Sequence, residues 1–157
     1  MIDGQRVGNK YWISSAVPDE VKAACEDILL KNEALIPGWV NEVRVYWDAE
    51  GDETEHGSGL AAAYMEASYA YRYASITICP PFLSEEKADR EIRIRHELCH
   101  IVSFPLIMYV KHVAETLSGE DDTVAQLVKK ELSEKIESMT EDLAQIIQNF
   151  EIKLNKK

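Results

Sequence analysis

Residues 91–102 read EIRIRHELCHIV, and residues 96–100 within them spell HELCH. In an α-helix, side chains four positions apart lie on one face, one turn from each other. The spacing therefore predicts that His96 and His100 project side by side, with Glu97 next to them. This stretch therefore belongs to a predicted helix, and the chemistry of the site depends on that helix.

The chemistry of this pattern indicates a metal site. Two imidazoles on one helix face can bind a single Zn²⁺, which readily accepts imidazole nitrogen. The glutamate after the first histidine lies beside such an ion and can take a proton from water whose pKa the metal has lowered. The alternative is a charged, solvated helix face with two idle histidines. The pattern favours a zinc site with His96 and His100 as ligands and Glu97 as general base.

A third zinc ligand is required, because two histidines alone make a weak site. Ser103 and Leu106 stand where an extended HExxHxxGxxH motif has glycine and histidine. His112 remains open as a ligand, although a surface histidine is the simpler interpretation. His56 is less favoured, because it lies in an acidic, glycine-rich stretch.

Glutamates near the C-terminus supply the favoured third ligand. Glu137 belongs to a row of small residues at helical spacing, which lets another helix approach closely; the other members are Ser133, Thr140 and Ala144. We predict Glu137 as the third ligand. Glu141, one turn later, is predicted either to support a ligating histidine by a hydrogen bond or to be the third ligand itself. The alternative is that both glutamates lie on a solvated helix face.

The remaining segments alternate between strand and helix patterns. Residues 17–37 predict a helix that Pro37 ends, and residues 39–48 predict a strand. Residues 49–59 are an acidic loop, and two short strands follow within residues 61–68 and 74–80. The last 74 residues, 84–157, predict three helices: the HExxH helix over about 84–103, broken at Phe104-Pro105, a second to Gly119, and a long amphipathic one to the end.

These elements predict one α+β domain over residues 1–157. An N-terminal helix and a small, mostly antiparallel sheet occupy about residues 17–80. The C-terminal helices occupy about residues 105–154.

Composition narrows the classes of partner. The chain has 157 residues and a formal net charge of −11, which disfavours nucleic acid and anionic membranes, because both need clustered Lys and Arg. The chain has no run of 18 apolar residues, so we expect no membrane span. The three cysteines are far apart in the sequence, which is typical of free thiols in a reducing cytoplasm. We expect a cytoplasmic protein with no nucleic-acid or membrane partner.

HELCH followed by ESMTEDLA at residues 137–144 resembles the small gluzincin-type zincins. With ASITICPPFL at residues 74–83, the arrangement is similar to the short metallopeptidases of bacteriophages and prophages. The resemblance covers about residues 61–150 and implies a zincin-like fold with zinc held by two histidines and a later glutamate. It also implies that residues 74–79 form the sheet edge that binds substrate, or its neighbour. A phage origin would place the protein in the host cytoplasm or the virion.

Two functions follow from these patterns. The first is a zinc metallopeptidase that acts on a peptide or protein, with Tyr109 or His112 as a donor to the transition state. The second is a binding module on a zincin scaffold with a structural or vestigial metal. In that case the partner is a phage or host protein. The chain would then serve as a virion component, as an assembly factor or as a decoy for a host protein.

Two neighbours of the histidines have other expected roles. Cys99 is expected to be a small buried thiol rather than a ligand. Arg93 and Arg95 are expected at the surface or paired with nearby acidic residues.

Overall fold

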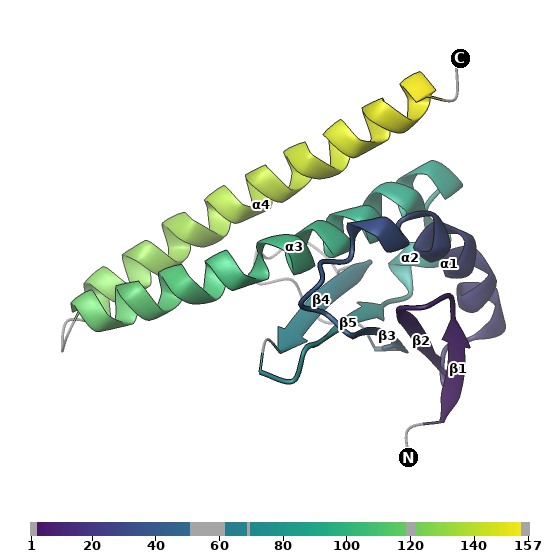
Figure 1. The fold of residues 1–157 in the computed structure, drawn as a ribbon, viewed down its shortest axis with the longest axis horizontal. Helices are drawn as coiled ribbons and strands as arrows, with labels where there is room; N and C mark the ends of the chain where they lie inside the picture. The colour runs from purple at the N-terminus through teal and green to yellow at the C-terminus, as the bar shows by residue number, and fades with distance from the viewer. Residues whose placement is uncertain (1–2, 51–61, 69, 119–121, 155–157) are drawn as a thin grey trace. The chain divides into compact units, whose positions relative to one another are not determined.

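The computed structural model of the chain describes residues 3–50, 62–68, 70–118 and 122–154. The chain divides into two compact units, residues 1–101 and residues 102–157. Figure 1 labels the elements. Helix α3 (Lys87–Ser118) belongs to both units, because the division falls after Ile101.

The first unit is built on a five-stranded sheet with the order β1-β2-β3-β5-β4. Its strands are β1 (Gly4–Val7), β2 (Tyr11–Ser14), β3 (Glu42–Trp47), β4 (Ala63–Ser68) and β5 (Tyr73–Ile78). Among the described strands, β4 lies at one end of this order and has β5 as its partner. The strands predicted within residues 39–48, 61–68 and 74–80 are therefore present, while the hairpin of β1 and β2 was not predicted. Its turn holds Gly8 at a φ of 60°, a left-handed conformation that glycine adopts without strain.

The expectation of a mostly antiparallel sheet is wrong. β1–β2 and β4–β5 are antiparallel, but β2–β3 and β3–β5 are parallel. Helix α1 (Asp19–Lys31) lies between β2 and β3 in the chain, and a helical crossover of this kind is what parallel neighbours require. β4 adds to the far side of β5 rather than between β3 and β5. The sheet is mixed, within the α+β class that was expected.

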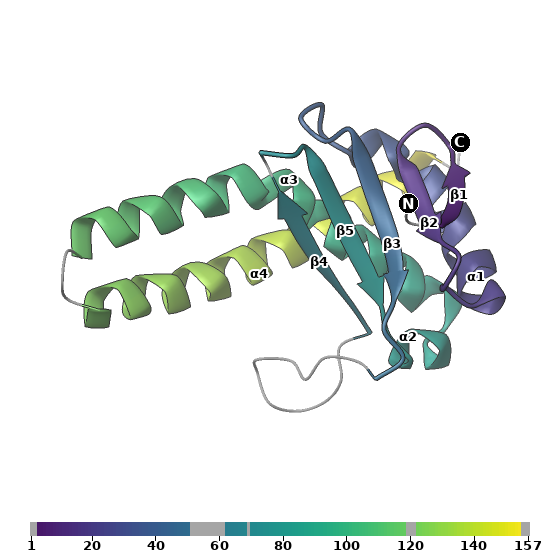
Figure 2. The same cartoon turned by 90° about the horizontal axis from the view of Figure 1, so that it is seen from below.

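One face of the sheet is covered by helices. Buried side chains alternate along β3, as with Val43 and Val45, whereas on β5 every residue from Ala74 to Ile78 is buried. The apolar ones share one core cluster with side chains of α1 and of the first part of α3. Figure 2 shows both helices behind the sheet, with the short helix α2 (Pro81–Ser84) at the end of β5. A single turn of 3-10 helix, η1 (Glu33–Leu35), follows α1.

The second unit consists of two helical segments. The part of α3 from Val102 onward and helix α4 (Asp122–Leu154) run in opposite directions beside each other in Figures 1 and 2. Between them they line an apolar pocket at Val110, Leu127 and Val128. The predicted long C-terminal helix is thus present.

The predicted break at Phe104-Pro105 is wrong, because α3 continues through Pro105 to Ser118. Proline removes one N–H group and crowds the carbonyl four residues earlier, so it destabilises a helix interior without always ending it. Residues 106–118 keep a helical pattern on the far side of Pro105. The helix also begins at Lys87 rather than near residue 84, because Pro81–Ser84 forms the separate helix α2.

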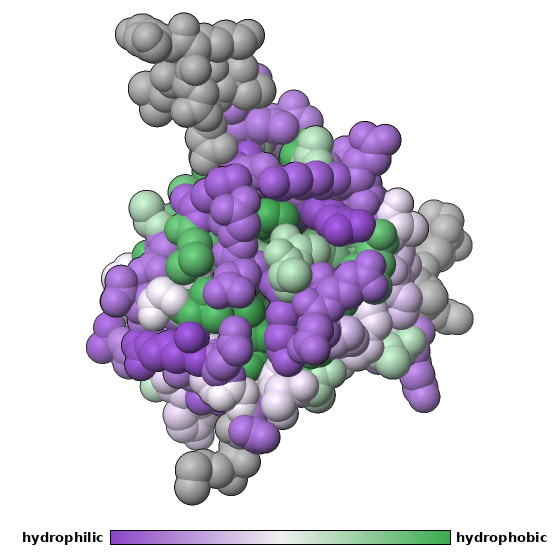
Figure 3. Space-filling view, turned by 90° about the vertical axis from the view of Figure 1, so that its right-hand side faces the viewer, coloured by the Kyte–Doolittle hydropathy of each residue, from purple (hydrophilic) through white to green (hydrophobic). Residues whose placement is uncertain are grey.

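Charged residues make up 29% of the chain. The face drawn in Figure 3 shows the result, with mostly hydrophilic residues and hydrophobic ones gathered near its middle. None of the helices in the described ranges combines the length and the hydropathy that crossing a membrane requires.

Candidate metal centre

The first part of α3 is anchored to the sheet by one apolar face. Ile94, Leu98 and Ile101 recur at i, i+4 and i+7, and each exposes 1% of its surface or less. All three belong to the core cluster of the first unit. A helix held along three consecutive contacts gives the neighbouring HELCH side chains a rigid base.

His96 and His100 lie side by side on this base. Their Nε2 atoms are 2.9 Å apart, and their rings meet edge to face with centroids separated by 4.6 Å. Both side chains are partly exposed. The predicted convergence of the two imidazoles on one helix face is therefore confirmed.

The spacing of the two nitrogens suits one zinc ion. Zn–N bonds of about 2.0–2.1 Å in a tetrahedral site place two ligating nitrogens about 3.3 Å apart. The observed separation of 2.9 Å differs from that by only a few tenths of an ångström. The two nitrogens are also within hydrogen-bond distance, and a small rotation of either ring would open the pair to the spacing that zinc requires.

Glu97 lies between these histidines in sequence and is 5% exposed. Carboxylates are seldom buried to this degree unless they are paired or have a function. At this position the side chain adjoins the turn that carries both imidazoles. The role of Glu97 as a general base stays a prediction.

Cys99 is a buried thiol, as expected. Its exposed fraction is 2%, and Cys25 and Cys79 are also free and buried. Burial raises the pKa of the Cys99 thiol, while the nearby Arg95 charge lowers it by less. The group therefore stays protonated at neutral pH, whereas the thiolate is the form that binds metal or attacks a substrate.

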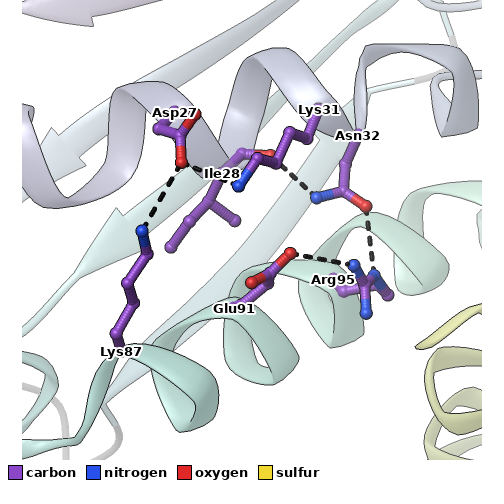
Figure 4. Close-up of polar contacts among 7 residues, drawn as sticks. All are labelled: Asp27, Ile28, Lys31, Asn32, Lys87, Glu91 and Arg95. Carbon is purple, nitrogen blue, oxygen red and sulfur yellow. Dashed lines mark hydrogen bonds and ion pairs between the residues drawn. The ribbon is translucent and has the colours of Figure 1, made fainter. Parts of the chain in front are cut away.

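Both arginines pair with local acids, as expected, but the burial of Arg95 was not predicted. Arg93 is half exposed and pairs with Glu85 at 3.2 Å, as predicted. Arg95 does pair with a local acid, Glu91, at 3.3 Å, but it is fully buried rather than at the surface. The reason is that Arg95 faces the C-terminal end of α1, where Asn32 accepts its Nε–H at 3.1 Å (Figure 4).

The predicted third ligand and its neighbour lie on α4, in the second unit. Glu137 and Glu141 are one turn apart, and both side chains are exposed. Further along the predicted row of small residues, Thr140 is fully buried and Ala144 is 2% exposed, whereas Ser133 is exposed. The row is thus buried in its C-terminal half. The ligand role of Glu137 stays a prediction.

The other candidates also stay predictions. Tyr109 is 66% exposed and His112 is exposed, both on the second part of α3. The Thr116 hydroxyl donates to the backbone carbonyl of His112. This contact does not involve the His112 imidazole, so it does not test the predicted role of that side chain. His56 lies outside the described residues, as does most of the predicted acidic loop.

Sequence reasoning missed Asn32, which is 1% exposed and connects the buried Arg95 to α1. The two residues are 63 positions apart, so no local pattern relates them. The sequence signal for Asn32 is its position just after an apolar helix, because asparagine is common at helix C-termini.

No family model matches the chain, and neither curated proteins nor solved structures gave a significant match.

Proposed function

We propose that this protein is a zinc-dependent metallopeptidase in which His96, His100 and Glu137 hold the metal. The observation that supports it most is the 2.9 Å separation of the two histidine Nε2 atoms. Each of the three side chains offers one atom that Zn²⁺ accepts, a ring nitrogen or a carboxylate oxygen.

When bound, Zn²⁺ supplies Lewis acidity, which polarises a carbonyl and makes water acidic near neutral pH. Glu97 takes the proton from the attacking water and returns it to the departing amine nitrogen of the substrate. Its 5% exposure keeps this carboxylate largely away from bulk water. A purely structural metal site has no use for such a base, which is why we prefer hydrolysis to a binding module.

The sheet edge supports a peptide as substrate. Among the described strands β4 has β5 as its one partner, so the other side of β4 is an edge. An extended peptide can add to such an edge through backbone hydrogen bonds. Residues 74–79 were predicted to form the substrate-binding edge or its neighbour. β5, which they largely form, lies inside the sheet, so we propose β4 as the edge that binds substrate and β5 as its neighbour.

Metal content of the purified protein tests the proposal. We expect about one zinc per chain by elemental mass spectrometry, and loss of that zinc in both His96→Ala and Glu137→Ala. Glu20→Ala, which changes an exposed glutamate outside the proposed site, serves as the matched control that keeps the metal.

Two results would change the proposal. Zinc lost in His96→Ala but kept in Glu137→Ala would move the third ligand to Glu141, Glu134 or His112. An unmodified protein that takes up no zinc, even when zinc is supplied, would contradict the proposed hydrolase function. The chain would then be better regarded as a binding module for a phage or host protein.

A further inference from the structure

In the second unit, a line of apolar side chains along each of the two helices reaches solvent. Val102 and Leu106 on α3 and Met139 on α4 each expose more than a third of their surface. The remaining members of the two lines are partly exposed. We call this surface the hairpin face, and it consists of Val102, Leu106 and Val113 on α3 and Val128, Leu132 and Met139 on α4.

Helix geometry places both lines on the same side of the helix pair. Each residue advances about 100° around a helix, so each exposed line is offset by roughly 60–100°, in the same sense, from the buried positions Ala114 on α3 and Ile136 on α4. Antiparallel helices turn in opposite senses when viewed from one end, so offsets of the same sign fall on one side. The apolar pocket agrees with this, because Val110 of α3 lines it together with Val128 and Leu132 of α4.

Two opposite charges border this pocket. Glu131 and Lys135 both line it, lie four residues apart on α4 and are exposed. Neither has an ion-pair partner among the residues that the structure describes. A two-fold axis through the midpoint of the pair would bring Glu131 of each chain to Lys135 of the other. The border is therefore complementary to a copy of itself, whereas a uniformly acidic or basic partner would meet one repelling charge.

The hairpin face has the size of a modest dimer interface. The part of α3 in the second unit is about 25 Å long at about 1.5 Å per residue. Two helices packed about 9 Å apart are roughly 20 Å wide, which gives a projected area of about 500 Å². Side-chain relief raises the accessible area toward the roughly 800 Å² per partner that stable complexes bury. An exposed apolar surface of this size is uncommon on a monomer.

We propose that the hairpin face is a dimerisation surface, on which a second copy of this chain packs antiparallel to complete a four-helix bundle. Burial of the apolar lines of both copies stabilises the dimer, and the contacts of Glu131 with Lys135 of the second copy set its register. Glu137 lies about 160° around α4 from Met139, so this interface leaves the proposed metal ligand uncovered. The inference goes beyond the proposed function and does not depend on it.

Sedimentation velocity of the full-length protein, over about a hundredfold range of concentration, tests the dimer. We expect a species with twice the mass of one chain, and the same concentration dependence with zinc and with a chelator. Leu106→Glu places a charge within the hairpin face and should weaken the dimer at least about tenfold, because association would bury that charge without a partner.

Two charge reversals test the partner and the register. In Glu131→Lys and in Lys135→Glu, the contacts across the axis join like charges, so each variant alone should dimerise about tenfold more weakly. When the two variants are mixed, these contacts join opposite charges again, and the dimer should return to within about threefold of the unmodified protein. Both positions are exposed, so these variants decide the test if Leu106→Glu fails to fold. Lys130→Glu is the matched control with unchanged dimerisation, since it makes the same charge change on the opposite side of α4.

Four results would overturn the proposal. The first is a monomer at every concentration, and the second is a dimer that dissociates in the chelator, because metal would then join the chains. The third is a dimer that folded Leu106→Glu leaves unchanged, because it would lie on another surface. The fourth is a mixture of the two reversals that dimerises as weakly as each variant alone, which would exclude the antiparallel pairing. Zinc content in the unmodified protein is measured separately, so the proposed function stands or falls independently of these results.

Discussion

At His96 and His100, a local rule produces a chemical arrangement. The four-residue spacing brings the two Nε2 atoms to 2.9 Å, and the adjacent Glu97 is nearly buried. Helix geometry accounts for the first fact and tertiary burial for the second. Together they make Glu97 the residue whose chemistry is most directly testable.

Glu97→Gln should abolish most peptide cleavage while leaving the metal in place. The amide has nearly the same shape but cannot take a proton, and general-base groups typically contribute about 10²–10⁴-fold to rate. Turnover of a peptide mixture, read by mass spectrometry, and zinc content are measured together. Glu86→Gln, at an exposed position just before α3, is the matched control. Equal turnover in the two variants would remove Glu97 from the mechanism.

Cys25 predicts a pH dependence of stability. Burial raises the pKa of its thiol from an ordinary value of 9.0 to about 12, and the Arg90 charge opposes this by less. Above pH 9 the unfolded chain loses this proton while the folded chain keeps it, so folding stability must fall as pH rises from about 9 to 12.

Urea unfolding at several pH values measures the effect. Cys25→Ala should show a smaller loss of stability between about pH 9 and 12 than the unmodified protein, because all other titrating groups are shared. Parallel profiles for the two proteins would contradict the assigned cause.

On the scale of the element, α3 is continuous where the sequence predicted two helices. Pro105 lies inside it, where a proline lacks the N–H that the turn before it would accept. The residues on both sides of Pro105 are nevertheless helical, and the helix continues to Ser118. The helix therefore carries an internal weak point a few residues after HELCH.

Pro105→Ala should stabilise the protein, by up to about 3 kcal/mol, because alanine restores the hydrogen bond and removes the crowding. Thermal unfolding followed by circular dichroism reports the change. Pro81→Ala is the control, since Pro81 is at the first position of α2, where proline is well tolerated and its removal gains nothing. A melting temperature that is unchanged or lower in Pro105→Ala would show that the helix is adapted to its proline.

On the scale of the whole molecule, the proposed ligands come from both units, His96 and His100 from the first and Glu137 from the second. A ligand that binds only the folded protein stabilises it by mass action. Zinc at 100 times its dissociation constant would add about 2.7 kcal/mol to the free energy of unfolding.

We therefore expect zinc to raise the melting temperature and a chelator to return it to the metal-free value. In Glu137→Ala the increment should be much smaller, while the chelator-treated form melts close to the unmodified protein. An equal zinc increment in Glu137→Ala would exclude it as a ligand and leave the rest of the site intact.

The features that could be predicted from the sequence are those that depend on near neighbours in the chain. The strands around β3, β4 and β5 follow from alternation, and α1 and α4 follow from helical spacing. The convergence of His96 and His100 follows from a four-residue interval. These features were predictable because each depends on contacts within one element, where backbone geometry relates position to direction.

The tertiary structure alone decided the features that depend on distant partners. The β2–β3 and β3–β5 pairs are parallel because of where α1 and β4 pack, which no single strand encodes. Arg95 resembles a surface arginine in sequence and is buried because Asn32, 63 residues earlier, meets it. Burial and pairing are sums over the whole fold, so a charged side chain in the core becomes visible only when the fold is complete.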